Sequence, residues 1–171
     1  MSSVSGPSVA PILEAEIEIS APPAAVWRLV SDPVLMGRLS PQVLRTRIRG
    51  GGPARLGTRT FNINRKGLLL WGTRAKVVSF EPERHYAFRV KDNFSIWSFT
   101  LEPTENGTRV IHRRETPDGV SGMSAKLTDR FMGGQAVFTA ELQRGLGQTL
   151  RRLKAEAERT RLIAGAEAQR I

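Results

Sequence analysis

The chain has 171 residues, 40% of them hydrophobic, which suits one globular domain with its own core, and we expect no second full domain. The absence of cysteine excludes disulfides, thiol nucleophiles and thiolate metal sites, and two histidines are too few for most zinc enzymes. No apolar run approaches the roughly 20 residues of a membrane span, and residues 1–11, predicted to be a flexible leader, lack the features of a signal peptide. We therefore expect a cytoplasmic protein that uses no metal and no cofactor.

The formal net charge of +10 comes from one segment of the chain. Residues 33–80 contain ten Lys and Arg residues and no acid, so the rest of the chain has 16 basic and 16 acidic residues. Such a segment is usually the solvated face of a sheet. The alternative is a surface that attracts nucleic acid or an anionic membrane, and the regular row of Arg45, Arg47 and Arg49 is the feature that favours it.

The first predicted element is a strand over residues 12–19, in which apolar residues alternate with glutamates. Pro22 and Pro23 follow this strand. Proline cannot donate a hydrogen bond to a sheet but fits the first turn of a helix, so the chain is predicted to change there from strand to helix. Ser20 or Ala21 is the expected N-cap of that helix.

Asp32 and Pro33 mark the end of the first helix, and a second short helix is predicted over residues 34–39. From Val43 onward the apolar residues alternate again, and turn signals separate successive runs. Six strands joined by short loops should form a mainly antiparallel meander. The predicted strands are 43–49, 56–64, 70–80, 84–90, 94–101 and 108–116.

The last third of the chain has a helical pattern, with apolar residues every three or four positions. One straight helix over residues 121–162 would be ~60 Å long, which exceeds the size of such a domain. We therefore predict a break near Gly133 and Gly134, with the long helix beginning there. Residues 163–171 are expected to form a tail.

These elements predict an α+β fold in which a seven-stranded antiparallel sheet wraps around a long C-terminal helix. Only that helix is long enough to cover the apolar face of the sheet. A curved sheet cannot touch a helix along its whole length, so a cavity should remain between them. The single domain is predicted to span residues 12–162.

Several short motifs stand out along the chain: Ile19-Ser20-Ala21-Pro22-Pro23 with Val26-Trp27, Asp32-Pro33, Ser40-Pro41, Glu81-Pro82, Trp97 with Leu101-Glu102-Pro103, Gly107-Thr108 and the terminal helix. In these motifs the chain resembles the START-like or Bet v 1-like superfamily, also called SRPBCC or polyketide cyclase/dehydrase-like, over roughly residues 12–158. The resemblance implies a helix-grip fold and an internal cavity that binds lipids, sterols, polyketides or other apolar molecules, and in some members cyclase or aromatase activity. Many bacterial members carry a tryptophan shortly before the Ser-Pro pair, where this chain has Arg38-Leu39.

The cavity wall is predicted by taking the more apolar face of each strand as the inner one. This choice places Ser79 inside on its strand. The last strand is ambiguous, and we favour the face that carries Val110, His112 and Arg114. The predicted ligand-binding residues are Trp71, Thr73, Tyr86, Phe88, Trp97, Phe99, His112, Arg114, Phe131 and Phe138.

The cavity favours binding of a small hydrophobic ligand with one polar end, because a buried Arg114 would need an acceptor from an acid, from water or from a ligand. The alternative is a polyketide cyclase, aromatase or dehydratase. Its catalytic candidates are His112 and Tyr86 as acid or base and Arg114 as the stabiliser of an enolate. No motif joins these three residues, so enzymatic activity stays open. Binding of nucleic acid is less expected, since the arginine row lacks any nucleic-acid-binding signature.

Overall fold

The computed structural model describes residues 12–168, apart from five side chains of the two C-terminal helices, so the predicted leader over residues 1–11 and the last three residues of the predicted tail lie outside it. The elements follow the predicted order, with bounds that differ by a few residues. They are β1 (Leu13–Ile19), α1 (Pro23–Val30), α2 (Pro33–Leu39), β2 (Val43–Ile48), β3 (Arg59–Lys66), β4 (Leu69–Glu81), β5 (His85–Val90), β6 (Ile96–Thr104), β7 (Gly107–Glu115), α3 (Gly122–Phe131) and α4 (Gln135–Ala168).

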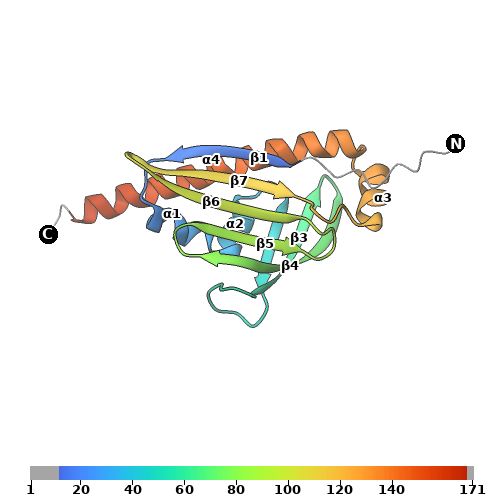
Figure 1. Cartoon of the computed structure of the whole chain (residues 1–171), viewed down its shortest axis with the longest axis horizontal. Helices are drawn as coiled ribbons and strands as arrows, with labels where there is room; N and C mark the ends of the chain where they lie inside the picture. The colour runs from blue at the N-terminus through green and yellow to red at the C-terminus, as the bar shows by residue number, and fades with distance from the viewer. Residues whose placement is uncertain (1–11, 169–171) are drawn as a thin grey trace.

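The seven strands form one antiparallel sheet in the order β1-β7-β6-β5-β4-β3-β2. Strands β2 to β7 follow one another as the predicted meander, and β1 joins the far edge beside β7. Helix α4 crosses one face of the curved sheet, and α1 and α2 lie on that same side (Figure 1). The predicted helix-grip fold is therefore confirmed.

The turn from β1 into α1 is held by tertiary contacts rather than by a capping side chain. The expected cap at Ser20 or Ala21 is wrong: Pro22 is the N-cap, and it has no side-chain hydrogen bond. The buried Thr108 hydroxyl donates to the Ala21 carbonyl oxygen over 2.7 Å. A Cβ added to Gly107 would lie 2.0 Å from the carbonyl oxygen of Ile19. Gly107 and Thr108 thus allow β7 to pack closely against the turn from β1 into α1.

A bulge in β4 changes which side chains face inward. The pairing with β5 shifts between Val77 and Ser79, so that Phe80 lies opposite Tyr86. Phe80 packs against the core, whereas the hydroxyl of Ser79 contacts Nδ1 of His85. The predicted inward position of Ser79 is therefore wrong, because strict alternation fails wherever a strand has an extra residue.

The predicted break in the C-terminal helix lies between α3 and α4. Gly133 and Gly134 have φ angles of 81° and 87°, a left-handed conformation that glycine adopts without steric cost. The two helices can therefore take different directions. Helix α4 then continues to Ala168 and includes residues 163–168 of the predicted tail. Within residues 12–168, no helix is both long and apolar enough to span a membrane.

Candidate functional site

A cavity of about 410 Å³ lies between the inner face of the sheet and α4, with α2 and α3 contributing to its wall. Its size falls in the range of small-molecule sites. The inner faces of β4 to β7 supply its aromatic part, and α4 supplies Phe138 and Leu142. Nine of the ten predicted ligand-binding residues line it: Trp71, Thr73, Tyr86, Phe88, Trp97, Phe99, His112, Arg114 and Phe138.

Phe131 is the predicted residue that does not line the cavity. Its side chain is 60% exposed at the end of α3, with the guanidinium of Arg130 5.8 Å from its ring centre. The prediction treated the apolar stripe as continuous across the break, but the two glycines turn α3 out of line with α4. The neighbouring Met132 is buried and lines the cavity instead.

His112 lies on the inner face of β7 and is 4% exposed. Its Nδ1 lies 3.0 Å from the Ser98 carbonyl oxygen, which can only accept, so Nδ1 carries the proton and Nε2 is an unprotonated acceptor. Burial lowers the pKa of His112 to about 4, although the bond to Ser98 opposes that shift. The ring is therefore neutral at physiological pH, and none of the described groups bonds to Nε2.

Arg114 lies two residues further along the same face of β7 and is 6% exposed. Its guanidinium lies 5.8 Å from the ring centre of Trp97, the residue directly opposite it on β6. Burial lowers the pKa of Arg114. No carboxylate among the described side chains lies within ion-pair distance of this guanidinium. A buried, charged donor group thus faces the cavity without an acidic partner.

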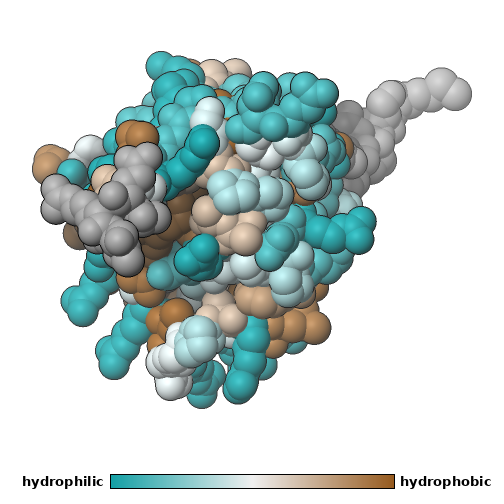
Figure 2. Space-filling view, turned by 90° about the vertical axis from the view of Figure 1, so that its left-hand side faces the viewer, coloured by the Kyte–Doolittle hydropathy of each residue, from teal (hydrophilic) through white to brown (hydrophobic). Residues whose placement is uncertain are grey.

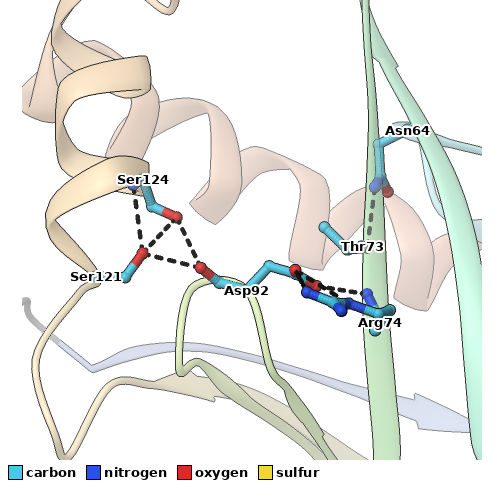
Figure 3. Close-up of polar contacts among 6 residues, drawn as sticks. All are labelled: Asn64, Thr73, Arg74, Asp92, Ser121 and Ser124. Carbon is cyan, nitrogen blue, oxygen red and sulfur yellow. Dashed lines mark hydrogen bonds and ion pairs between the residues drawn. The ribbon is translucent and has the colours of Figure 1, made fainter.

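Both carboxylates that line the cavity are engaged elsewhere. Glu141 of α4 binds the ammonium group of Lys66 over 2.6 Å. Asp92 binds the guanidinium of Arg74, also over 2.6 Å (Figure 3). Burial alone would raise the pKa of Asp92, but its bonds to Arg74 lower it overall. Neither acid is therefore free to neutralise Arg114.

Trp97 is held in place by a short chain of hydrogen bonds. Its Nε1 donates to the hydroxyl of Ser95 over 3.0 Å, and that hydroxyl donates to Oδ1 of Asn93 over 2.7 Å. Ser95 is fully buried. Asn93 and Ser95 therefore fix the ring that supports Arg114. The sequence gives no sign of this chain of hydrogen bonds, because the chain depends on the β5–β6 turn.

Tyr86 lies deeper, where the cavity meets the main core. It is 2% exposed and makes edge-on contacts with Trp27 and Phe80, at ring-centre distances of 6.4 and 6.2 Å. Burial raises the pKa of its phenol, and the nearby charge of Asp32 adds to the effect. The structure therefore brings His112 and Arg114 together on β7 and leaves Tyr86 among core aromatics on β5.

Strands β2, β3 and β4 also contribute polar, uncharged side chains to the wall. Asn64 is buried, and its amide donates to the Thr73 hydroxyl over 3.0 Å (Figure 3). The polar residues of this part of the wall are Thr46, Thr60, Asn62, Asn64 and Thr73. Of these, only Thr73 was predicted, because a run of Thr and Asn on an inner face looks like a solvated strand.

Helix α3 closes one end of the cavity and is tied to the sheet at its first turn. The hydroxyls of Ser121 and Ser124 both donate to the backbone carbonyl oxygen of Asp92, over 2.8 and 3.2 Å (Figure 3). At the other end of α3, the ammonium of Lys66 donates to the Met132 carbonyl oxygen over 3.0 Å. Contacts at both of its ends therefore position this helix.

The arginine row lies away from the cavity. Arg45 and Arg47 are exposed on the outer face of the edge strand β2 and pair with the exposed Ile63 and Phe61 of β3. Arg49 follows the strand and is also exposed. Viewed from the end at which α4 terminates, the surface is largely hydrophilic, with apolar residues in separate patches (Figure 2). Contact of the row with an anionic surface stays a prediction.

The sheet, the helix across it and the cavity between them define a helix-grip protein. The chain belongs to the family described as polyketide cyclase/dehydrase and lipid transport, whose model matches residues 10–158. No curated protein matches the chain.

Solved structures share the fold at low sequence identity. TTHA0849 from Thermus thermophilus has 18% identity and a TM-score of 0.66, covering 88% of this chain and 99% of that one. The Polyketide_cyc-like protein Cgl2372 from Corynebacterium glutamicum has 22% identity and a TM-score of 0.56, covering 90% and 92%. The di-domain ARO/CYC protein StfQ from the steffimycin biosynthetic pathway has 14% identity and a TM-score of 0.67, covering 87% of this chain and 51% of that one. At these identities the likeness establishes the fold alone.

Proposed function

We propose that this protein binds a small hydrophobic ligand in the cavity between the sheet and α4. The observation that carries the proposal is the cavity of about 410 Å³, whose wall combines aromatic side chains with a few polar groups. Each 100 Å² of apolar ligand surface removed from water contributes about 2.5 kcal/mol, before the costs of association. The aromatic wall is therefore expected to supply most of the affinity, and the polar groups the orientation.

Binding is tested with N-phenylnaphthylamine, an apolar dye that fluoresces on leaving water, and with native mass spectrometry of the purified protein for a retained ligand. Thr60→Trp would place a large ring on the inner face of β3, whereas Arg59→Trp would place it on the outer face of the same strand. We expect saturable dye binding that Thr60→Trp weakens and Arg59→Trp does not. Absence of saturable binding and of any retained ligand would refute the proposal.

A second candidate is a cyclase or dehydratase, and the pair of His112 and Arg114 favours it. The two side chains project from one face of β7 at a spacing of about 7 Å. Unprotonated Nε2 of His112 could remove a proton next to a carbonyl group, and Arg114 could stabilise the enolate that forms. If the ligand carries a hydroxyl on the carbon β to the carbonyl, the enolate would form a C=C bond as that C–O bond breaks. The protonated ring would return its proton to the leaving hydroxyl, so that one water is lost overall.

The enzymatic candidate is tested on whatever ligand mass spectrometry identifies. If the protein transforms it, His112→Gln should keep the affinity within about threefold and reduce turnover by about a hundredfold or more. Turnover that is unchanged in this variant would exclude His112 as the base. Recovery of the ligand unaltered after prolonged incubation with the wild-type protein would leave binding as the function.

A further inference from the structure

We infer that the ligand of this cavity carries an anionic oxygen group, a carboxylate or an ionised enol or phenol, which the Arg114 guanidinium binds. The inference rests on the proposed function and narrows it. An apolar acid should bind more tightly than a neutral lipid, alcohol or sterol of the same size.

The first observation is that Arg114 is buried without an acid. It is 6% exposed, and each described carboxylate of the cavity wall already binds another cation. A guanidinium remains charged in proteins and offers five N–H donors, so burial does not remove its need for acceptors. The cavity is the space next to Arg114 in which an acceptor can be accommodated.

The contrast with the neighbouring arginines of β7 makes the observation specific. Arg113 and Arg109 point to the outer face, where β1 supplies each with a carboxylate: Arg113 binds Glu14, and Arg109 binds Glu16. Arg114 points to the inner face, where β1 places Leu13 opposite it. Strands β1 and β7 thus neutralise their outward arginines and leave the inward one for another partner.

The Arg114 guanidinium also lies next to the ring of Trp97. One side of Arg114 lies over the ring of Trp97, which attracts the cation but accepts none of its N–H groups. Trp97 is fixed in turn through the hydroxyl of Ser95. No described carboxylate pairs with the guanidinium, and the donor edge of an arginine matches a carboxylate with two parallel hydrogen bonds. Carboxylate is therefore the group that we expect to bind best.

The experiment compares two dyes that share one skeleton and differ in charge. Anilinonaphthalene sulfonate is the anion, and N-phenylnaphthylamine lacks the sulfonate. Each is titrated into wild-type protein and into Arg114→Met and Arg114→Lys. Arg113→Met is the matched control, since it removes the same charge from the outer face of the same strand. Displacement of the dyes by decanoate and by decanol then tests a carboxylate against an alcohol of equal chain length.

We expect the wild type to bind the anionic dye at least about tenfold more tightly than the neutral one, and decanoate to displace either dye better than decanol. Arg114→Met should lose the preference for the anion while keeping the neutral dye, Arg114→Lys should keep part of it, and Arg113→Met should keep all of it. Equal affinity of the wild type for both dyes, with decanol as effective as decanoate, would overturn the inference. That outcome needs no variant, so it decides the matter even if Arg114→Met does not fold.

The result also separates this inference from the proposed function. If the neutral dye binds in the cavity and the anionic dye binds no more tightly, hydrophobic binding stands and the inference of an anionic group on the ligand is wrong. If neither dye binds, the proposed function itself fails. A preference for the anion that Arg113→Met removes as well would show that overall surface charge attracts the dye, and would contradict the assignment to Arg114.

Discussion

The imidazole of His112 stacks on the ring of Phe99, with ring centres 3.9 Å apart and planes within 7° of parallel. The two residues are direct partners across β7 and β6. The contact covers one face of the imidazole with hydrocarbon, while Nδ1 donates to the Ser98 carbonyl oxygen. The ring is therefore held neutral and in one tautomer, which makes its protonation measurable through stability.

Protonation of His112 should destabilise the protein in mildly acidic solution. The pKa is about 4 in the fold and about 6.5 in an unfolded chain, so between these values the unfolded state binds more protons. The stabilising effect of neutral His112 on the free energy of unfolding is fully present above pH 6.5. It is lost as the pH falls toward 4, which lowers the free energy of unfolding by about 3 kcal/mol in total. Urea unfolding between pH 4 and pH 8 measures it.

The control for this prediction is His112→Phe, which keeps a flat ring on Phe99 and cannot be protonated. The difference in unfolding free energy between wild type and variant should change with pH between about 4 and 6.5 and be constant above. A difference that is constant over the whole range would contradict a buried neutral histidine.

Ser95→Ala should reduce the preference for anionic ligands without emptying the cavity. The change removes the acceptor for Nε1 of Trp97 and the link to Asn93, so the ring beneath Arg114 loses its fixed position. We expect the ratio of anionic to neutral dye affinity to fall about threefold to tenfold, with neutral dye binding unchanged. Ser95→Thr keeps the hydroxyl and should restore the ratio. Equal weakening of both dyes would indicate a structural role only.

The sequence was sufficient to predict the fold, because the spacing of its apolar residues distinguishes strands, with a period of two, from helices, with a period of 3.6, and the turn residues separate these elements. The inner face of β7 was ambiguous in the sequence, because Val110 and Ile111 lie on opposite faces, and the favoured face with the fully buried Val110 is the inner one. The prediction of inward residues failed at the β4 bulge, where one extra residue changes the register. It also failed at Phe131, because the break between α3 and α4 changes the direction of the apolar stripe. The Asn93–Ser95–Trp97 chain could not be predicted, because it depends on the folded turn.

Gly107→Ala should destabilise the fold strongly. The added Cβ would lie 2.0 Å from the carbonyl oxygen of Ile19, which is backbone and can move only if the corner before α1 moves with it. We expect a loss of about 2–3 kcal/mol in unfolding free energy, measured by chemical denaturation. Gly122→Ala is the control, since open space surrounds that position at the start of α3. A cost below about 0.5 kcal/mol for Gly107→Ala would show that the contact relaxes freely.

Lys66→Met should loosen α3 while leaving the sheet intact. The ammonium of Lys66 joins β3 to the Glu141 carboxylate of α4 and to the Met132 carbonyl oxygen after α3, and methionine keeps the length of the side chain without either bond. Because both partners of the ion pair are partly exposed, the loss should be local and small, and amide exchange in residues 122–131 should rise about twofold to tenfold. Lys76→Met on the exposed outer face of β4 is the control and should leave exchange unchanged.

Since α3 closes one end of the cavity, faster exchange there should be accompanied by faster dissociation of bound dye. Unchanged exchange in Lys66→Met would mean that the two serine bonds to Asp92 hold the helix by themselves.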